Sequence, residues 1–366
     1  MKSVLSLFLF LLFFCSCERQ EQENSVIKVD VSSAKELDLK ELVKEINIIP
    51  LETNDSCLVG DRFTMQVRNG AVYITNGWKE VLKFDAEGRF IRSTLPKNGQ
   101  NADEYAITYS TYVDKEDNLE IYEMFLPRIQ KYNKDFEYME TLPVEVPNTV
   151  SSQRARTHVK LNDSIYAFKD LYDIHFYSTI KKQVVKTLHE EFPGLLGWTT
   201  HLMLVDYDDK WHYSRSYSCD TLFYLDEKEL ELKPELVFDF GGKSFNVNDL
   251  PSNMSAEYYQ KIIVETDKYL VLEKINLSDK KFCIFIGSDN SYVSYTTKKG
   301  SKVYRINKQN PFPVPDAIEH NMFYNLVWPV DLKERIKTEL LDKESLKRLP
   351  QIKEEDNPVL IRYKLK

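Results

Sequence analysis

Residues 81–91 have the sequence Val81-Leu82-Lys83-Phe84-Asp85-Ala86-Glu87-Gly88-Arg89-Phe90-Ile91. Apolar residues on both sides of the Asp85–Gly88 segment predict two short strands, and Asp-x-x-Gly between them is typical of a tight turn. The stretch therefore predicts a β-hairpin. Immediately before it, the apolar run 71–75 and the dipeptide Asn76-Gly77 predict a further strand and turn.

Similar units recur along the chain. They lie at residues 129–138, 174–185 and 220–230, and a fifth begins at Val303. The aromatic residues that anchor the first four units are spaced 48, 44 and 48 residues apart, and they are Phe84, Tyr132, Phe176 and Tyr224. Repeats of about 40–50 residues that are rich in short strands indicate the four-stranded blades of a propeller. We therefore predict an all-β fold, a β-propeller whose chain length fits six blades better than seven.

The sequence pattern predicts a strand near each end of the expected propeller. One lies near residues 46–51, and the chain finishes with the apolar run 359–365. A propeller that is not closed leaves sheet edges unpaired, so we expect the two termini to complete one blade together. Two segments with apolar residues at helical spacing interrupt the strands, near 250–264 and 331–349. The second is bracketed by Pro329 and Pro350, with Asp331 as its expected cap.

The N-terminus has the features of an export signal. Lys2 precedes an apolar run at residues 4–14, which is too short to span a bilayer as a helix. The following Ser16-Cys17 resembles the lipobox of bacterial lipoproteins, in which a small residue precedes the lipid-bearing cysteine. We expect a lipoprotein signal peptide at 1–16, lipidation at Cys17, a flexible tether at 17–25 and a single β-propeller domain at 26–366. An ordinary cleaved signal peptide is the alternative.

Four sequence motifs resemble those of the six-bladed β-propeller lipoprotein family of Gram-negative gut bacteria. They are Ile48-Ile49-Pro50-Leu51-Glu52-Thr53, the hairpin 84–90, the loop Gly99-Gln100-Asn101-Ala102-Asp103-Glu104-Tyr105, and Asn357-Pro358-Val359-Leu360 with the closing residues 364–366. The loop departs from the family's Gly-x-Gly-Pro-x-Glu-Tyr pattern at Asn101 and Ala102. The resemblance implies the propeller fold and an outer-membrane lipoprotein of the cell envelope, and exposure on the cell surface is an open alternative to a periplasmic location. It assigns no role to Glu104 or Tyr105.

Composition and motifs exclude several function classes. The net charge is −8, and no Lys/Arg cluster is interleaved with aromatic residues, so nucleic acid is not an expected partner. The sequence has no GxSxG, GxxxxGK[ST] or GxGxxG motif. Residues 206–209 include three aspartates, which are enough carboxylates to bind calcium. The segment lacks the glycine and the distal glutamate of an EF-hand loop. We expect a hairpin turn there. Cys57, Cys219 and Cys283 are expected to be buried thiols.

Two polar and aromatic clusters are candidate ligand-binding sites. The first contains Trp198, His201, Trp211 and His212, which would form an aromatic-lined face if their strands are adjacent. The second contains Arg154, Arg156 and His158, which would reach an anionic ligand from a loop. The alternatives are a packed blade core for the first cluster and a solvated connection for the second.

These observations favour a ligand-binding or scaffold module that is anchored to the membrane by its N-terminal lipid. Its ligand would be a glycan, a peptide or a partner outer-membrane protein. Distant kin of the family include propellers that use a metal in the central channel, so a metal-dependent hydrolase or lyase is the alternative. No cofactor is predicted, although a divalent metal such as calcium would serve that alternative. A purely structural envelope subunit is the third possibility.

Overall fold

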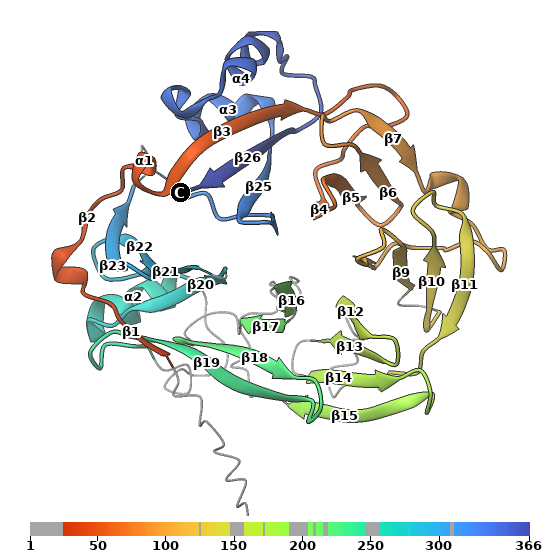
Figure 1. Ribbon diagram of the computed structural model, residues 1–366, viewed down its shortest axis with the longest axis horizontal. Helices are drawn as coiled ribbons and strands as arrows, with labels where there is room; N and C mark the ends of the chain where they lie inside the picture. The colour runs from red at the N-terminus through yellow and green to blue at the C-terminus, as the bar shows by residue number, and fades with distance from the viewer. Residues whose placement is uncertain are drawn as a thin grey trace, which may run out of the picture.

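The computed structural model describes residues 25–123, 126–146, 157–170, 173–189, 204–207, 210–214, 219–245, 256–277, 279–307 and 311–366. Six sheets, each with four antiparallel strands, surround a common axis, as Figure 1 shows. Predicted strand and hairpin patterns fall on these sheets, so the prediction of an all-β, six-bladed propeller is confirmed.

Each blade contains four consecutive antiparallel strands, apart from the sixth. Blade 1 comprises β4 (Phe63–Arg68), β5 (Ala71–Asn76), β6 (Glu80–Phe84) and β7 (Phe90–Ser93). Blade 2 comprises β8 (Ser110–Val113), β9 (Leu119–Glu123), β10 (Arg128–Tyr132) and β11 (Tyr138–Pro143). Blade 3 comprises β12 (Thr157–Asn162), β13 (Ile165–Lys169), β14 (Asp173–Ser178) and β15 (Gln183–His189).

Blades 4 and 5 follow in chain order, and blade 6 combines strands from both ends of the described chain. Blade 4 comprises β16 (Leu204–Tyr207), β17 (Lys210–Ser214), β18 (Thr221–Asp226) and β19 (Glu231–Asp239). Blade 5 comprises β20 (Leu270–Asn276), β21 (Lys280–Ile286), β22 (Ser291–Thr297) and β23 (Gly300–Ile306). Blade 6 comprises β24 (Ala317–Glu319), β25 (Met322–Val327), β26 (Val359–Leu365) and β3 (Val43–Pro50).

The N-terminal segment runs along the outer edges of two blades before it closes the ring. β1 (Ser25–Lys28) pairs in parallel with β19, and β2 (Lys35–Glu36) pairs in parallel with β23. A short 3-10 turn, η1 (Val31–Ser33), and helix α1 (Leu39–Leu42) connect these strands to β3. β3 then pairs antiparallel with β26, which confirms that both termini complete the sixth blade.

Helical insertions occur at both predicted places. α2 (Ala256–Thr266) lies between blades 4 and 5 in the sequence. The second insertion is not one helix but α3 (Pro329–Arg335), η4 (Thr338–Leu340), α4 (Lys343–Arg348) and η5 (Leu349–Gln351). The backbone is extended at Ile336, at Lys337 and again at Leu341, where Leu341 forms a parallel bridge with Ile46 of β3. None of the helices within the described ranges is long and apolar enough to cross a membrane.

Large aromatic side chains fill the interfaces between blades. The predicted anchors Phe84, Tyr132 and Phe176 are fully buried on the third strands of blades 1 to 3, and Tyr224 is half-buried on the third strand of blade 4. The fifth predicted unit, at Val303, lies instead on the fourth strand of blade 5, β23. Cys57 and Cys283 are buried free thiols, as expected, whereas Cys219 is only half-buried.

The two faces of the ring differ in the length of their connections. Strands within a blade alternate in direction, so the connections from the first to the second strand and from the third to the fourth lie on one face of the ring. The connections from the second to the third strand, and those between blades, lie on the opposite face. On the first face the turns have only two to five residues, so we call it the short-turn face. The long-connection face carries connections that include 51–62, 94–109, 240–269 and 328–358.

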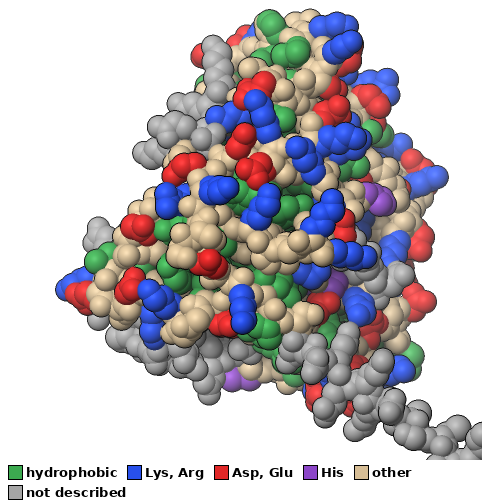
Figure 2. Space-filling model, turned by 60° about the vertical axis from the view of Figure 1, so that its left-hand side comes forward, with side chains coloured by type: hydrophobic (Ala, Val, Ile, Leu, Met, Phe, Trp, Pro, Cys, Tyr) green, Lys and Arg blue, Asp and Glu red, His purple; other side chains and the backbone are tan. Residues whose placement is uncertain are grey.

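η2 (Leu95–Lys97) belongs to the long connection between blades 1 and 2. Figure 2 views the surface from one side, and there Lys and Arg side chains are interspersed with Asp and Glu. Among the described residues visible in that view, no large area carries charge of a single sign. Such a mixed surface is typical of a solvated protein face.

Candidate functional site

Most of the residues predicted to bind a ligand lie outside the described ranges. These are Arg154, Arg156, Trp198 and His201, and the predicted lipidation site Cys17 also lies outside them. Trp211 and His212 are both described, as neighbours on β17. His158, grouped with the two arginines in the sequence, is described on β12.

The structure places Trp211 and His212 on opposite sides of their blade. The Trp211 side chain packs between blades 3 and 4 with Val159 and Phe176, and only 5% of the residue is exposed. Successive residues of a strand point to opposite faces of the sheet, so His212 points away from this cluster. The two residues therefore do not form a shared aromatic face, and the buried Trp211 matches the packed-core alternative.

His212 belongs to a polar cluster between blades 4 and 5. Its Nδ1 lies 2.8 Å from Oε2 of Glu235, and the side-chain amide of Asn276 donates to the same carboxylate oxygen at 3.1 Å. Burial acts to raise the pKa of Glu235, but the hydrogen bond and charge of His212 outweigh it and lower that pKa. The cluster is an interblade contact in which the His212 ring, the Glu235 carboxylate and the Asn276 amide nitrogen lie within hydrogen-bond distance of one another.

His158 is buried between blades 2 and 3 and does not line a surface loop. Its Nδ1 lies 2.8 Å from Oγ of Ser110, and its Nε2 lies 3.8 Å from Oε2 of Glu120. The hydroxyl of Tyr166 donates to Oε1 of Glu120 at 2.6 Å. Burial raises the pKa of Glu120 to about 7 and lowers the pKa of His158 to about 3. Both groups are therefore uncharged over part of the mildly acidic range, as their burial requires.

The loop 99–105 that resembles the family motif has a structural role. The Glu104 carboxylate accepts hydrogen bonds from the backbone and side-chain amides of Asn101 at 2.9 and 2.8 Å. The Tyr105 ring is fully buried, and its hydroxyl lies 2.6 Å from Oγ1 of Thr94. Asn101, where the chain departs from the motif, thus supplies partners for Glu104 and keeps the loop closed.

An exposed tryptophan, Trp78, stands on the long-connection face. It lies in the short turn between β5 and β6, and 64% of the residue is exposed. Leu58 and Leu95, on the long connections that flank this turn, are also exposed, at 52% and 40%. We call these three exposed apolar residues, which lie on adjacent connections of one face, the Trp78 patch.

Hydrogen bonds from both flanking connections hold the Trp78 turn in place. The side chain of Asn76 accepts from the Gly60 amide at 2.8 Å and donates to the Leu58 carbonyl at 2.9 Å. From the other side, the Thr108 amide donates to the Trp78 carbonyl at 3.0 Å. The Tyr105 hydroxyl donates to the carbonyl of Lys79, also at 3.0 Å. The turn backbone is thus fixed while the indole remains exposed.

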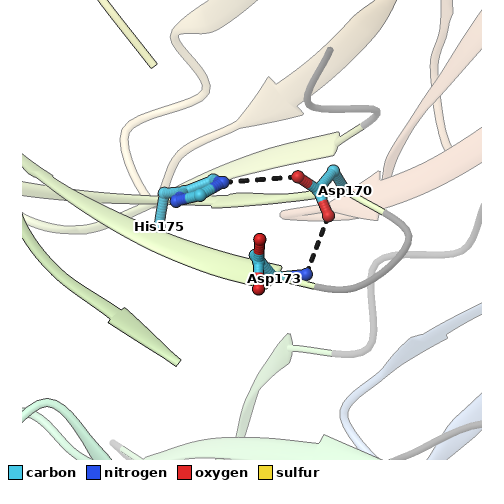
Figure 3. A group of neighbouring side chains, drawn as sticks. All are labelled: Asp170, Asp173 and His175. Atoms are coloured by element: carbon cyan, nitrogen blue, oxygen red, sulfur yellow. Dashed lines mark hydrogen bonds and ion pairs between the residues drawn. The ribbon is translucent and has the colours of Figure 1, made fainter. Parts of the chain in front are cut away.

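A group of metal-binding side chains lies at the turn between β13 and β14 in blade 3. It contains Asp170, Asp173 and His175, and one ligand atom from each lies within 4.8 Å of the others (Figure 3). Nε2 of His175 lies 3.3 Å from Oδ2 of Asp170, and the Asp173 amide donates to Oδ1 of Asp170 at 2.7 Å. Asp170 and His175 are buried, and Asp173 is half-buried.

Comparison with known proteins places the chain in a family. Residues 24–364 match the family described as a domain of unknown function, DUF4934. The chain belongs to the DUF4934 family. No curated protein matches this DUF4934 sequence.

Two solved structures share the fold of this DUF4934 chain. One is a protein from Bacteroides fragilis NCTC 9343 that is predicted to be exported; it is 16% identical, with 93% of this chain and 100% of that chain covered at a TM-score of 0.67. The other is a member of the DUF4221 family from Bacteroides vulgatus ATCC 8482; it is 11% identical, with 89% and 97% covered at a TM-score of 0.53. At these identities, the likeness concerns the fold alone.

Sequence reasoning missed both the Trp78 patch and the blade 3 cluster. Trp78 directly follows the predicted Asn76-Gly77 turn, and an aromatic residue at the tip of a short turn has few neighbours that can bury it. The blade 3 cluster has the spacing Asp-x-x-Asp-x-His over residues 170–175, at the start of a predicted strand. Period-2 alternation alone places Asp173 and His175 on one face of that strand.

Proposed function

We propose that this protein is a lipid-anchored binding module of the cell envelope, whose partner docks on the long-connection face of the propeller. The proposed anchor is Cys17, after removal of the signal peptide 1–16. The predicted export of the B. fragilis protein, which has the same fold, supports an envelope location. Peptide or protein is the favoured class of partner.

The observation that carries this proposal is the difference between the two faces. Tight turns of two to five residues cover the short-turn face, whereas the opposite face carries long connections around a closed ring. Rigid scaffolds usually bind ligands through such loops, because loops vary without disturbing the strands that hold them. The long-connection face therefore has the architecture of a binding surface.

The Trp78 patch is the proposed contact point on that face. A tryptophan contributes a large apolar area and is enriched among residues that dominate binding energy. The hydrogen bonds around its turn fix the backbone in advance, which reduces the entropy lost on binding. The side chain of Asn76 is already paired with backbone groups, so the patch offers mainly apolar contact. Apolar contact suits peptide and protein side chains better than a glycan.

The metal-dependent hydrolase or lyase requires ligands from several blades to converge on the central channel. Within the described parts of the chain, the residues that could hold a metal ion all belong to the β13–β14 region of blade 3. Convergence of ligands from different blades is thus not observed among those residues, and the binding module remains the better-supported function.

The test is a thermal-shift screen of the full chain, purified in detergent, against envelope-derived peptides, glycan fragments and divalent metals. Any hit is measured again with Trp78→Ala. The matched control is Ile180→Ala, which removes an apolar side chain that is 79% exposed in a turn of the short-turn face. Both variants should unfold at the temperature of the unmodified chain, because neither residue is buried.

A peptide that raises the melting temperature of the unmodified chain and of Ile180→Ala, but not of Trp78→Ala, supports the proposed site. If Ile180→Ala abolishes the shift and Trp78→Ala retains it, the binding face has been assigned wrongly. A shift with glycan fragments alone would contradict the favoured partner class.

A further inference from the structure

We propose that Asp170, Asp173 and His175 form a binding site for a divalent transition metal, with zinc as the best match. This inference goes beyond the proposed binding function and depends on a different region, the β13–β14 turn of blade 3. Figure 3 shows the three side chains, with His175 and Asp170 directed toward each other.

The distance between the two buried donors suits a shared metal ion. Nε2 of His175 and Oδ2 of Asp170 are 3.3 Å apart. In a tetrahedral site with metal–ligand bonds of about 2.0–2.1 Å, neighbouring donor atoms lie roughly 3.3 Å apart. A charged hydrogen bond between the same groups would be about 2.7–2.9 Å long. The observed distance is therefore long for a strong ion pair and fits an edge of a metal tetrahedron.

Each proposed ligand also has an outer hydrogen-bond partner. Nδ1 of His175 lies 3.0 Å from Oγ1 of Thr187. Oδ1 of Asp173 lies 2.7 Å from Nδ1 of His189, and Oδ1 of Asp170 accepts from the Asp173 amide. Metal-binding histidines and carboxylates are commonly oriented by such partners, which act on the atoms that do not bind the metal.

The threonine hydroxyl allows His175 to present either ring nitrogen as the acceptor. If Nδ1 donates its proton to Oγ1 of Thr187, the lone pair of Nε2 faces Oδ2 of Asp170. Two electron-rich atoms that face each other at this distance are stabilised by a cation between them. The side chain of Asp170 has no exposed surface, so a bound cation would also offset the cost of burying its charge.

The donor set selects the class of metal. Calcium and magnesium prefer oxygen ligands alone, whereas one imidazole with carboxylates suits zinc and related transition metals. Asp173 is half-buried and the side chain of His189 is 67% exposed, so one side of the cluster reaches the surface. Three protein ligands thus leave one coordination position on the solvent side, for water or a ligand.

The test measures binding of zinc chloride to the full chain, purified without an affinity tag in detergent and stripped of metal with a chelator. Isothermal titration is run with zinc, manganese and calcium on the unmodified chain, Asp173→Asn and His175→Gln. His212→Gln is the matched control, because His212 is also buried beside a carboxylate, that of Glu235, but lies in a different contact, between blades 4 and 5. Asp173→Asn retains the main-chain amide that donates to Asp170, so its fold should be preserved.

We expect one zinc ion per chain, at least tenfold weaker binding in Asp173→Asn, loss of binding in His175→Gln and unchanged binding in His212→Gln. Melting curves without metal verify that each variant is folded. Cobalt provides a second readout, because its visible spectrum reports coordination by an imidazole and should change in His175→Gln. Absence of saturable zinc binding, or equal binding by both cluster variants, would overturn the site. Binding of calcium in preference to zinc would overturn the assignment of metal class.

Discussion

The side-chain amide of Asn357 donates to the main-chain carbonyl of Glu52 at 2.7 Å, across 305 residues of sequence. The same amide donates to the Cys57 carbonyl at 2.8 Å, and Oδ1 of Asn357 accepts from the Val59 amide at 2.9 Å. The Glu52 carboxylate in turn accepts from the amide of Phe90 at 2.9 Å. Three of the four family-like motifs therefore meet where blade 6 joins blade 1, and their residues stabilise ring closure.

Asn357→Ala should lower the free energy of unfolding by roughly 2–4 kcal/mol, because it removes the side-chain partner of the Val59 amide and of the Cys57 carbonyl, and one of two donors to the Glu52 carbonyl. Chemical denaturation of the full chain measures this change. Asn290→Ala is the control, since Asn290 is exposed and its side chain donates to its exposed neighbour Asp289. Equal stability of the two variants would show that the Asn357 contacts do not hold the closure.

Gly88→Ala should destabilise the protein at least twice as much as Gly241→Ala. Both glycines have positive φ, +82° and +64°, so alanine at either position costs about 1 kcal/mol or more in backbone conformation. At Gly88 alone, the added Cβ would lie 2.3 Å from the Pro50 carbonyl oxygen, whereas at Gly241 nothing lies within 4 Å. Thermal unfolding of both variants provides the comparison. Similar losses of stability in the two variants would argue against tight contact between the first hairpin and β3.

Glu120→Gln should change how stability depends on pH. The pKa of Glu120 is raised by burial to about 7 in the folded protein, while the unfolded chain has an ordinary value near 4.5. The stabilising contribution of its bound proton is complete below about pH 4.5 and is lost as the pH rises through 7. This loss amounts to roughly 3 kcal/mol. Glutamine stays neutral and still accepts from the Tyr166 hydroxyl.

The variant should therefore gain stability relative to the unmodified chain between pH 5 and pH 8. Melting temperatures at intervals across this range measure the difference. Burial lowers the pKa of His158 to about 3, so in the fold its ring stays neutral across this range and its contribution is shared by both proteins. A difference that does not vary with pH would mean that Glu120 ionises normally in the fold.

Trp211→Ala should strongly lower the free energy of unfolding, whereas Trp78→Ala should leave it almost unchanged. Trp211 is 5% exposed in the core between blades 3 and 4, so its removal should cost about 3–5 kcal/mol. Trp78 is 64% exposed, and its removal should change stability by less than about 0.5 kcal/mol. Denaturant unfolding of both variants checks this. Strong destabilisation by Trp78→Ala would give that indole a structural role and weaken the proposed contact site.

The blade repeat was predictable because each repeat is indicated by residues that are close together in the sequence. Strand alternation around Phe84, Tyr132 and Phe176, with turn residues at fixed offsets, indicates hairpins without knowledge of distant contacts. The second helical insertion was predicted less well, because Leu341 pairs with Ile46, nearly three hundred residues earlier. A tertiary contact of that kind overrides helical spacing, and the spacing alone does not reveal it.

The candidate sites were less predictable than the fold. Trp211 and His212 are adjacent in sequence, yet the pleat of β17 sends them into different interblade spaces. His158 followed two arginines in sequence, but its strand places it beside Glu120 in the blade 2–blade 3 interface. Residues that cluster in sequence were thus separated by side-chain alternation, while residues on different blades were brought together.

The sequence by itself determined a propeller of antiparallel blades and favoured six blades over seven, because strand period, turn residues and repeat length are local properties. The tertiary structure alone decided which polar groups meet: Asn357 with Glu52, His158 with Glu120, and the outer partners of Asp170, Asp173 and His175. These contacts depend on how each sheet packs against the next and on which side of a strand each residue lies. The register between distant strands sets both, and no local pattern specifies that register.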